Sequence, residues 1–449
     1  MHKHPSELID QGLMSRLQIF AVIICILLNA LDGFDVLAIS FASPGIAAEW
    51  SITRAELGIV LAMELVGMAI GSVFLGNQCD RIGRKPTIMI CLVLMTTGMC
   101  LAAIVQSVNE LLIVRLITGL GIGGMLAATN AMVAEFANKK YRHLCVILMA
   151  TGYPMGAIVG GAISTELLQI YSWRAIFIFG GVTTGAFILI AWRYLPESTV
   201  YLANKQPQDA LFKINKLLTR MGKATLKALP AKTDNKQKSG YKALFTGQMK
   251  AITLLLVVAY FAQIMTFYFI LKWVPKIVVD MGFHPSQAGQ VLVWANVGGA
   301  IGATLLGLFA SRLPLRKLLI SVLILSFVMV SVFGIGYESI SQLALICAAT
   351  GFFTNSGVVG LYALMAQVFP AEVRGSGTGI VIGFGRGGAA LSPVIAGLLF
   401  TQGVSLQGVS ICLGAGALVA ALAVFLLGRA ASAQQTASSG PSPVSSESR

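Results

Sequence analysis

Charged residues are scarce in this chain of 449 residues. Asp, Glu, Lys and Arg make up only 11% of the sequence, hydrophobic residues make up 56%, and the mean hydropathy is +0.81. Because a water-soluble domain carries about 25% charged residues, this composition excludes a soluble globular protein. The seven cysteines form no C-x-x-C pair, so we interpret them as reduced, small hydrophobic residues and expect no metal site.

The chain also lacks the patterns of an enzyme. It contains no evident nucleophile–base set and no phosphate-binding loop, and the glycine-rich run 119–124 follows no predicted strand, which indicates helix packing. We therefore expect no cofactor and disfavour an integral membrane enzyme or sensor. The net charge of +14 could indicate a nucleic-acid partner, but the basic residues lie in loops between apolar segments, so we expect none.

Long apolar segments are what the sequence does contain. Stretches of about 20 apolar residues match the thickness of a lipid bilayer, and twelve of them can be marked. They run approximately over 17–40, 55–77, 86–106, 110–134, 143–168, 174–195, 250–272, 286–310, 318–337, 340–364, 375–400 and 405–428. The predicted fold is an all-α membrane protein of two six-helix bundles, 1–196 and 250–428. A linker at 197–249, with short amphipathic helices, and a disordered tail at 429–449 complete the chain.

The distribution of basic residues predicts the topology. If both termini and the linker share one side, that side holds 25 of the 32 Lys and Arg residues, and the opposite side holds four. The four are Arg54, Arg174, Lys272 and Lys276. Basic residues favour the cytoplasmic side, so we expect both termini and the linker in the cytoplasm.

The two halves are expected to repeat each other. About 232 residues separate Gly119 from Gly351, and the loop pattern that contains Asp80 has a weaker copy around Ser311. Repeated six-span halves with a binding site between them are one plan of secondary transporters.

Three motifs resemble those of the major facilitator superfamily. They are Gly76-x-x-x-Asp80-Arg81-x-Gly83-Arg84-Lys85, Arg115-x-x-x-Gly119-x-Gly121-x-Gly123, and Pro196-Glu197-Ser198. Within the superfamily, three further stretches are similar to the aromatic acid:proton symporter family. These are Asp32-Gly33-Phe34-Asp35, Lys272-Trp273-Val274-Pro275, and the run 383–388 around Arg386.

The resemblance implies a function. It implies a monomeric symporter of the cell (inner) membrane that imports protons with a small aromatic acid of the hydroxybenzoate or benzoate type, by alternating access, for aromatic catabolism. The alternative is a proton symporter for a non-aromatic acid, such as the dicarboxylate muconate or a sugar acid. In span five, the position that carries Pro in drug/proton antiporters is Ala157, which counts against an antiporter.

Acidic residues inside the spans are the candidate proton sites. An ionisable residue at mid-span costs about 2.5–3.5 kcal/mol, so it persists where it lines a cavity or has a partner. Asp32 and Asp35 share one helical face in the outer half of span one, where they could hold a proton or simply be solvated near a helix end. Glu64 is a further candidate for proton coupling, or a hydrogen-bond donor to a neighbouring helix.

Two arginines inside the spans are the candidate partners of these acids and of the substrate. Arg115 is expected to take part in proton coupling by pairing with one of the two Asp residues, or to form a purely structural ion pair. Arg386 is expected to bind the substrate carboxylate, because a guanidinium binds a carboxylate with two hydrogen bonds; a packing or gating role is the alternative. Phe34, Tyr268 and Asn355 are expected to contribute to the substrate site.

The loop between spans two and three is expected to be a conformational latch. By the resemblance, Gly76, Asp80, Arg81, Gly83, Arg84 and Lys85 form a charge relay that favours one access state. Orientation of the chain by positive charge is the alternative role for these residues.

Overall fold

The computed structural model describes residues 5–10, 12–230, 244–310, 312–370 and 373–438. Twelve of its helices are long and apolar enough to cross a membrane, which confirms the predicted number of spans, and the described residues contain no β-strand. The first six are α2 (Arg16–Trp50), α3 (Arg54–Ile82), α4 (Arg84–Ala102), α5 (Val108–Phe136), α6 (Arg142–Ile170) and α7 (Arg174–Tyr194). The second six are α11 (Gly247–Asp280), α12 (Pro285–Ala310), α13 (Leu315–Phe333), α14 (Ile340–Val368), α15 (Arg374–Thr401) and α16 (Leu406–Ser438).

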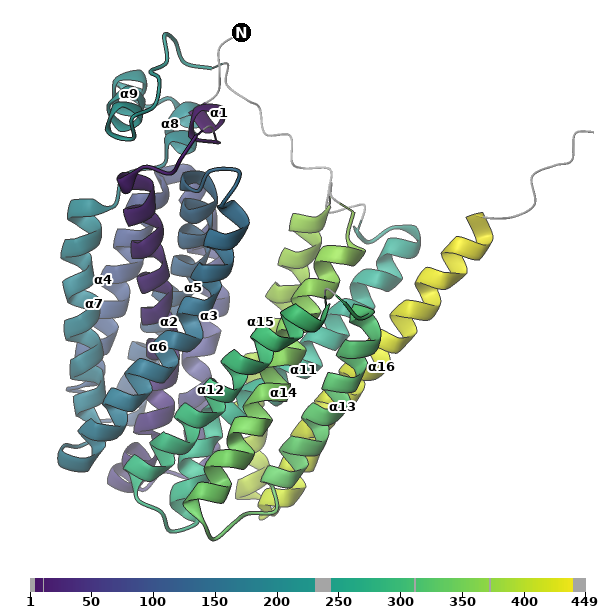
Figure 1. Cartoon of the computed structure of the whole chain (residues 1–449). Helices are drawn as coiled ribbons and strands as arrows, with labels where there is room; N and C mark the ends of the chain where they lie inside the picture. The colour runs from purple at the N-terminus through teal and green to yellow at the C-terminus, as the bar shows by residue number, and fades with distance from the viewer. Residues whose placement is uncertain (1–4, 11, 231–243, 311, 371–372, 439–449) are drawn as a thin grey trace, which may run out of the picture.

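The twelve helices form two bundles that stand side by side (Figure 1). In the N-terminal bundle α2 packs on α6, α3 on α5, and α4 on α7. The C-terminal bundle repeats these pairs in the same order, because α11 packs on α15, α12 on α14, and α13 on α16. The repeat of the halves that the sequence predicts is therefore a repeat of helix packing.

Glycines allow the closest helix pair of each bundle to form. A Cβ added to Gly119 of α5 would lie 2.1 Å from the carbonyl oxygen of Glu64 on α3. A Cβ added to Gly351 of α14 would lie 1.9 Å from the carbonyl oxygen of Ala295 on α12. These are the two glycines that the 232-residue spacing pairs, so the repeat preserves a backbone-to-backbone contact that small residues make possible.

The two bundles meet through crossed helix pairs. α3 packs on α15. The equivalent helices of the repeat, α12 and α6, also pack on each other, and so do α2 and α11. We call the end that carries α1 (Pro5–Asp10), α8 (Thr199–Lys205) and α9 (Ala210–Arg220) the linker end. The ribbons of the two bundles approach each other at the opposite end and diverge toward the linker end (Figure 1).

Close contacts hold the bundles together at that opposite end. Arg54 forms an ion pair with Asp280 across the interface at 2.9 Å, and its guanidinium lies 5.3 Å from the ring centroid of Phe400. A Cβ on Gly58 would lie 2.5 Å from the carbonyl oxygen of Pro393, so the backbones of α3 and α15 nearly touch there.

Helices α2 and α11 are longer than predicted. α2 continues past residue 40 to Trp50, and α11 continues past Lys272 to Asp280. The polar residues that mark the ends of the predicted spans are buried inside the protein, as Ser40 and Ser43 show, so they do not end the helices.

The linker and the tail also contain helix. α8 and α9 confirm the short helices expected in the linker, and α9 is amphipathic, with Ala210, Ile214 and Leu218 buried on one face. α16 continues to Ser438, so the tail predicted to be disordered from residue 429 begins as helix. The tail beyond Ser438 lies outside the described residues.

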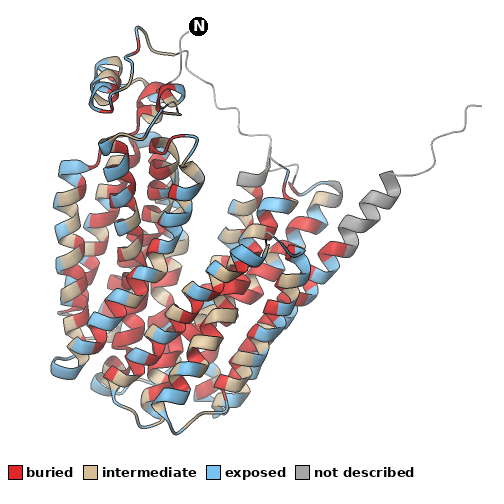
Figure 2. Cartoon of the chain, in the orientation of Figure 1, coloured by how far each residue is buried: buried red, intermediate tan, exposed pale blue. Residues whose placement is uncertain are grey.

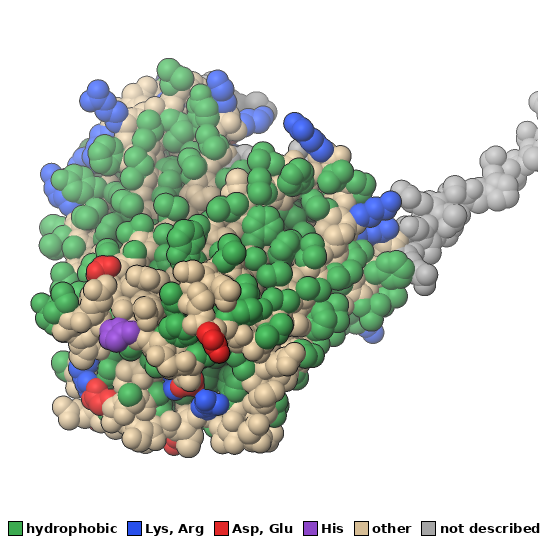
Figure 3. Space-filling view, turned by 60° about the horizontal axis from the view of Figure 1, so that its bottom comes forward, with side chains coloured by type: hydrophobic (Ala, Val, Ile, Leu, Met, Phe, Trp, Pro, Cys, Tyr) green, Lys and Arg blue, Asp and Glu red, His purple; other side chains and the backbone are tan. Residues whose placement is uncertain are grey.

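The outer surface suits a bilayer. Buried residues gather inside each bundle and between the bundles, while the outward helix faces are exposed (Figure 2). Many exposed residues are large and apolar, among them Phe74, Val182, Leu189 and Leu345. Hydrophobic side chains cover the flank of the molecule, and the charged ones visible in this view lie mainly toward its two ends (Figure 3).

Candidate functional site

Asp32 and Asp35 lie on one face in the middle of α2. Both are buried, with 2% and 0% of their surface exposed. Within the part of the chain that the structure describes, no hydrogen-bond donor reaches their carboxylate oxygens. Their expected position in the outer half of the span is wrong, because α2 continues to Trp50. Solvation at a helix end therefore does not explain them.

Glu64 and Arg115 form an ion pair between α3 and α5, and both side chains have 0% exposure. Arg115 also donates to the backbone carbonyl oxygen of Asp35 at 3.1 Å, and its guanidinium lies 5.4 Å from the ring centroid of Phe177. The expected partner of Arg115 was an Asp carboxylate. Its ion-pair partner is Glu64 instead, and it meets Asp35 only through the backbone.

Lys272 is a buried cation, although the sequence predicts it at the outer end of span seven. Its side chain has 0% exposure, its ammonium donates to the carbonyl oxygen of Val36, and it lies 3.5 Å from Glu64. Since α11 continues for two turns beyond it, Lys272 lies inside the helix and reaches from one bundle into the other. The apolar residues that follow, such as Val274, Val278 and Val279, were a signal that could have located it.

Arg386 also crosses from the C-terminal to the N-terminal bundle. Its guanidinium donates to the carbonyl oxygen of Met68 at 2.7 Å and is partly buried. Met68 lies one turn after Glu64 on α3. The two cations Lys272 and Arg386 therefore converge on neighbouring turns of α3 from two different helices.

A small cavity lies between the two bundles. Its volume is about 40 Å³, and it is lined by residues of α6, α11, α12 and α14, among them Tyr153, Leu271, Asn296 and Asn355. Asn355 donates to the carbonyl oxygen of Gly299 at 2.9 Å. Such a volume holds a few water molecules at most, so a ring-sized ligand requires the bundles to move apart.

The two predicted aromatic residues lie in different surroundings. Tyr268 packs edge-on against Phe267, a lining residue of the cavity, with ring centroids 5.5 Å apart. Phe34 packs edge-on against Phe179 inside the N-terminal bundle, with ring centroids 5.4 Å apart. Phe34 is not among the residues that line the cavity, so its predicted contact with substrate gains no support from this geometry.

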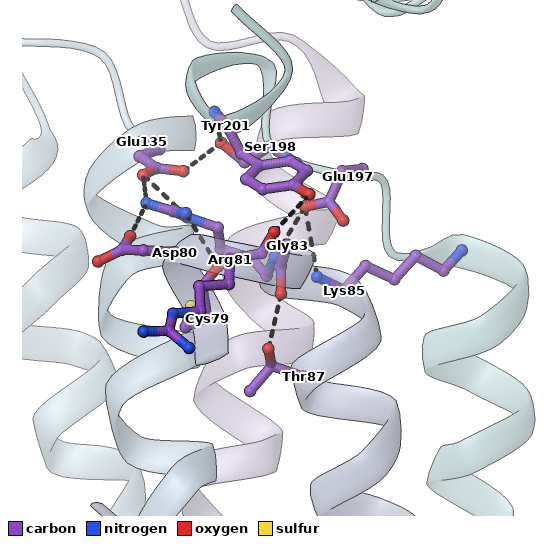
Figure 4. Close-up of polar contacts among 11 residues, drawn as sticks. Cys79, Asp80, Arg81, Gly83, Lys85, Thr87, Glu135, Glu197, Ser198 and Tyr201 are labelled. Carbon is purple, nitrogen blue, oxygen red and sulfur yellow. Dashed lines mark hydrogen bonds and ion pairs between the residues drawn. The ribbon is translucent and has the colours of Figure 1, made fainter. Parts of the chain in front are cut away.

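The predicted latch residues form a polar network at the linker end (Figure 4). Arg84 forms ion pairs with Asp80 at 3.0 Å and with Glu135 of α5 at 2.8 Å, and Glu135 accepts a hydrogen bond from Ser198. Lys85 donates to the carbonyl oxygen of Trp192 at 2.7 Å. The sequence analysis did not name Glu135, although its place at the end of span four was a usable signal.

Glu197 completes this network from the junction of α7 and α8. Its carboxylate accepts hydrogen bonds from the backbone N–H groups of Arg84 at 2.9 Å and Ser198 at 2.7 Å. Burial raises the pKa of Glu197, and these backbone hydrogen bonds offset only part of that effect.

The backbone of Gly83 is shaped for this contact. Gly83 has φ +111°, and a Cβ there would lie 2.4 Å from Glu197 Oε2, so only glycine fits. The carbonyl oxygen of Arg81 accepts a hydrogen bond from Tyr201 at 3.1 Å. Gly76 is not under the same constraint, because a Cβ there would make only an ordinary contact at 3.5 Å.

Comparison with known proteins identifies relatives over nearly the whole chain. The sequence matches the Major Facilitator Superfamily over residues 25–292 and 256–447. It is 29% identical to the gallate transporter of Pseudomonas putida, with 94% of each chain covered. It is also 29% identical to the 3-(3-hydroxy-phenyl)propionate transporter of Escherichia coli, over 90% of this chain and 92% of that one. The 4-hydroxybenzoate transporter PcaK of Pseudomonas putida is again 29% identical, with 95% and 96% covered.

Solved structures show the same fold at lower identity. The inward open conformation of the xylose transporter XylE from E. coli superposes with a TM-score of 0.71 at 17% identity, covering 92% of this chain and 96% of that chain. A bacterial homolog of the human lysosomal transporter Spinster, in an inward-facing and occupied conformation, gives a TM-score of 0.71 at 14% identity, with 92% and 97% covered. The twelve spans, the repeated bundles and the profile match together establish that this chain is a membrane transporter of the Major Facilitator Superfamily.

Proposed function

We propose that this chain imports a small aromatic acid together with protons, as a monomer, across the cell (inner) membrane. One observation carries the proposal: cations of the C-terminal bundle meet a set of buried charged residues of the N-terminal bundle at the interface between them. The N-terminal bundle contributes Asp32, Asp35, Glu64 and Arg115, and the C-terminal bundle contributes Lys272 and Arg386. A soluble anion and a proton are the ligands that such a set can bind.

Asp32 and Asp35 are the proposed proton site, with Glu64 and Arg115 next to it. A carboxylate that has no hydrogen-bond donor in the interior is costly to keep charged and unpaired. A proton that binds one member of the pair removes one buried charge and the repulsion between the two. Arg115 connects this pair to the neighbouring helices, because it donates to the backbone of Asp35 and pairs with Glu64 of α3.

Arg386, Tyr268 and Asn355 are the proposed contacts of the acid. The contact of Arg386 with Met68 is to a neutral carbonyl oxygen, which a substrate carboxylate could replace with a stronger, charge-assisted pair. Tyr268 and the cavity lining offer aromatic surface, and Asn355 offers an amide to ring hydroxyl groups. The names of the relatives, which specify gallate, 4-hydroxybenzoate and benzoate, support an aromatic acid as cargo.

Alternating access is the proposed mechanism. The bundles make close contact around Arg54 and Asp280 at the end opposite the linker. With the linker in the cytoplasm, this state keeps the outer path closed. Rocking of the bundles around the charged centre would open the outer path, and the return would release acid and proton to the cytoplasm.

Uptake into vesicles tests the function. Labelled 4-hydroxybenzoate should accumulate in vesicles that contain the full-length protein under an imposed pH gradient, inside alkaline, and a protonophore should abolish the accumulation. Unlabelled gallate, benzoate, muconate and gluconate compete in parallel. Competition by muconate or gluconate, with none by the aromatic acids, would assign the chain to non-aromatic acids.

Substitution of Arg386 tests the proposed carboxylate contact. Arg386→Ala should reduce uptake by about tenfold or more, because one charge-assisted contact is lost, and Arg386→Lys should raise the half-saturation concentration. Initial uptake rates over a range of acid concentrations measure both effects. If Arg386→Ala binds the acid as tightly as the parent protein, Arg386 has only a packing role.

A further inference from the structure

Lys272 is held in the interface by two acceptors of the N-terminal bundle. Its ammonium donates to the carbonyl oxygen of Val36 on α2 and lies 3.5 Å from Glu64 Oε2 on α3. Because Lys272 belongs to α11 of the other bundle, these contacts must break when the bundles separate there. An ammonium left in the interior without a counter-ion is strongly unfavourable, so a replacement anion favours separation.

Glu64 does not depend on Lys272 for its own charge. Arg115 pairs with the other carboxylate oxygen of Glu64 within the N-terminal bundle, and it remains there when the bundles separate. The contact of Glu64 with Lys272 is the longer of its two ion pairs. Lys272 is therefore the partner that can leave, and Arg115 is the one that stays.

The cavity lies along the stretch of α11 that precedes Lys272. Ile270 and Leu271, the two residues before it on α11, line the cavity. If the cavity enlarges along α11 when the bundles separate, it extends toward Lys272. The charged and titratable groups that interact with this region from the packed helices are Asp32 and Asp35 on α2, Arg115 on α5, Tyr153 on α6, Tyr268 on α11 and Arg386 on α15.

We propose that Lys272 is a second cation for the substrate carboxylate, and that Glu64 and the substrate compete for it. When the proton taken up at Asp32 and Asp35 passes to Glu64, it removes the competing charge, so Lys272 is free to bind the incoming acid. When the acid leaves, Lys272 returns to ionised Glu64 and Val36. Proton and acid are thereby linked through one shared ammonium. This inference rests on the proposed function and adds to it a residue that takes part in both binding events.

Binding to the purified full-length protein tests the exchange. Isothermal titration with 4-hydroxybenzoate, benzoate, muconate and gluconate is performed on the parent protein, Lys272→Met, Glu64→Gln and the double variant. Lys276→Met is the matched control: it removes the same charge one turn further along α11, where Lys276 pairs with Asp280. Gel filtration and membrane abundance establish that each variant is folded.

The expected results distinguish exchange from a structural ion pair. Lys272→Met should weaken binding of the acid by about tenfold or more, and Lys276→Met should change it by less than about twofold. Glu64→Gln should strengthen binding and reduce its dependence on pH, because the competitor is neutral. The double variant should bind as weakly as Lys272→Met. If Lys272→Met does not fold, the double variant, which removes both charges, is compared with Glu64→Gln alone and should bind at least about tenfold more weakly.

Recovery of parent affinity in the double variant would overturn the inference, because it would mean that Lys272 only neutralises Glu64. The panel separates this failure from failure of the proposed function. If the parent protein binds a non-aromatic acid and no aromatic one, the proposed function is wrong, and the variants test Lys272 with the acid that binds. If it binds no acid of the panel, both proposals are overturned.

Discussion

At the scale of single residues, the buried charged side chains fall into two groups: those with a partner and those without one. Arg115 and Lys272 each pair with Glu64 and donate to a backbone carbonyl oxygen, whereas Asp32 and Asp35 are buried without a donor in the described structure. Paired charges can be purely structural, but two adjacent unpaired carboxylates are expensive to maintain for stability alone. Their place in the centre of α2 therefore supports the proposed proton site.

Replacing either Asp tests that task. Asp32→Asn and Asp35→Asn keep the size of the side chain but cannot ionise, so each should lower uphill accumulation by about tenfold or more. Exchange of labelled for unlabelled acid across the vesicle membrane should persist, since exchange needs no net movement of protons. Accumulation ratios with and without an imposed pH gradient measure the effect.

The double variant Asp32→Asn/Asp35→Asn is the stricter test of the proposed proton site. If it still accumulates acid and still responds to the pH gradient, the proton site is elsewhere, and Glu64 becomes the next candidate.

At the scale of helices, the polar network at the linker end connects five elements. Asp80 closes α3, Arg84 opens α4, Glu135 closes α5, and Glu197 joins α7 to α8. The side chain of Asp80 is 80% exposed, whereas that of Glu135 is 14% exposed. An exposed ion pair contributes little, so the contact of Arg84 with Glu135 is expected to dominate.

Neutral substitutions of Glu135 and Asp80 should therefore reduce uptake to different extents. Glu135→Gln should reduce uptake by about tenfold, because Arg84 loses its buried counter-ion, and Asp80→Asn should reduce it by about twofold. Initial rates are normalised to the amount of protein in the membrane. The opposite ranking would mean that the exposed Asp80 is the main partner of Arg84 during the transport cycle.

The helices and their repeat could be predicted from the sequence, but the partners of the charged residues could not. Apolar length located twelve spans, and the spacing of Gly119 and Gly351 located equivalent packing contacts. Hydropathy located a span end wrongly where a polar residue faces protein instead of lipid. The predicted first span was therefore too short, and the predicted seventh span ended at Lys272 instead of continuing to Asp280. The pairing of Arg115 with Glu64 depends on how α3 approaches α5, and no single-sequence pattern records that distance.

At the scale of the molecule, the placement of basic residues distinguishes the two ends. Three of the four cations assigned to the end opposite the linker form ion pairs there: Arg54 and Lys276 share Asp280, and Arg174 pairs with Glu49. The fourth, Lys272, is buried. Because Lys272 lies inside the protein, three basic residues remain at the end opposite the linker, which supports the expected orientation.

Thiol labelling of intact cells measures the orientation. In a variant without the seven native cysteines, an impermeant reagent should label Ser51→Cys and should not label Gln208→Cys, since both positions are exposed but lie at opposite ends. After the cells are opened, both should react. Labelling of Gln208→Cys in intact cells would invert the proposed topology.

The balance of charge between the bundles has an electrical consequence. Three carboxylates (Asp32, Asp35 and Glu64) oppose two guanidinium groups (Arg115 and Arg386) and the Lys272 ammonium. When all six groups are ionised, their charges sum to zero. Addition of one monoanionic acid and one proton leaves that sum unchanged. The empty and the loaded carrier would then both reorient without moving charge through the membrane field, where each elementary charge is worth about 2.3 kcal/mol per 100 mV. A potassium diffusion potential imposed at equal pH should therefore drive no accumulation, and rapid addition of acid on a solid-supported membrane should give no sustained current. A current that scales with uptake would require more than one proton for each acid.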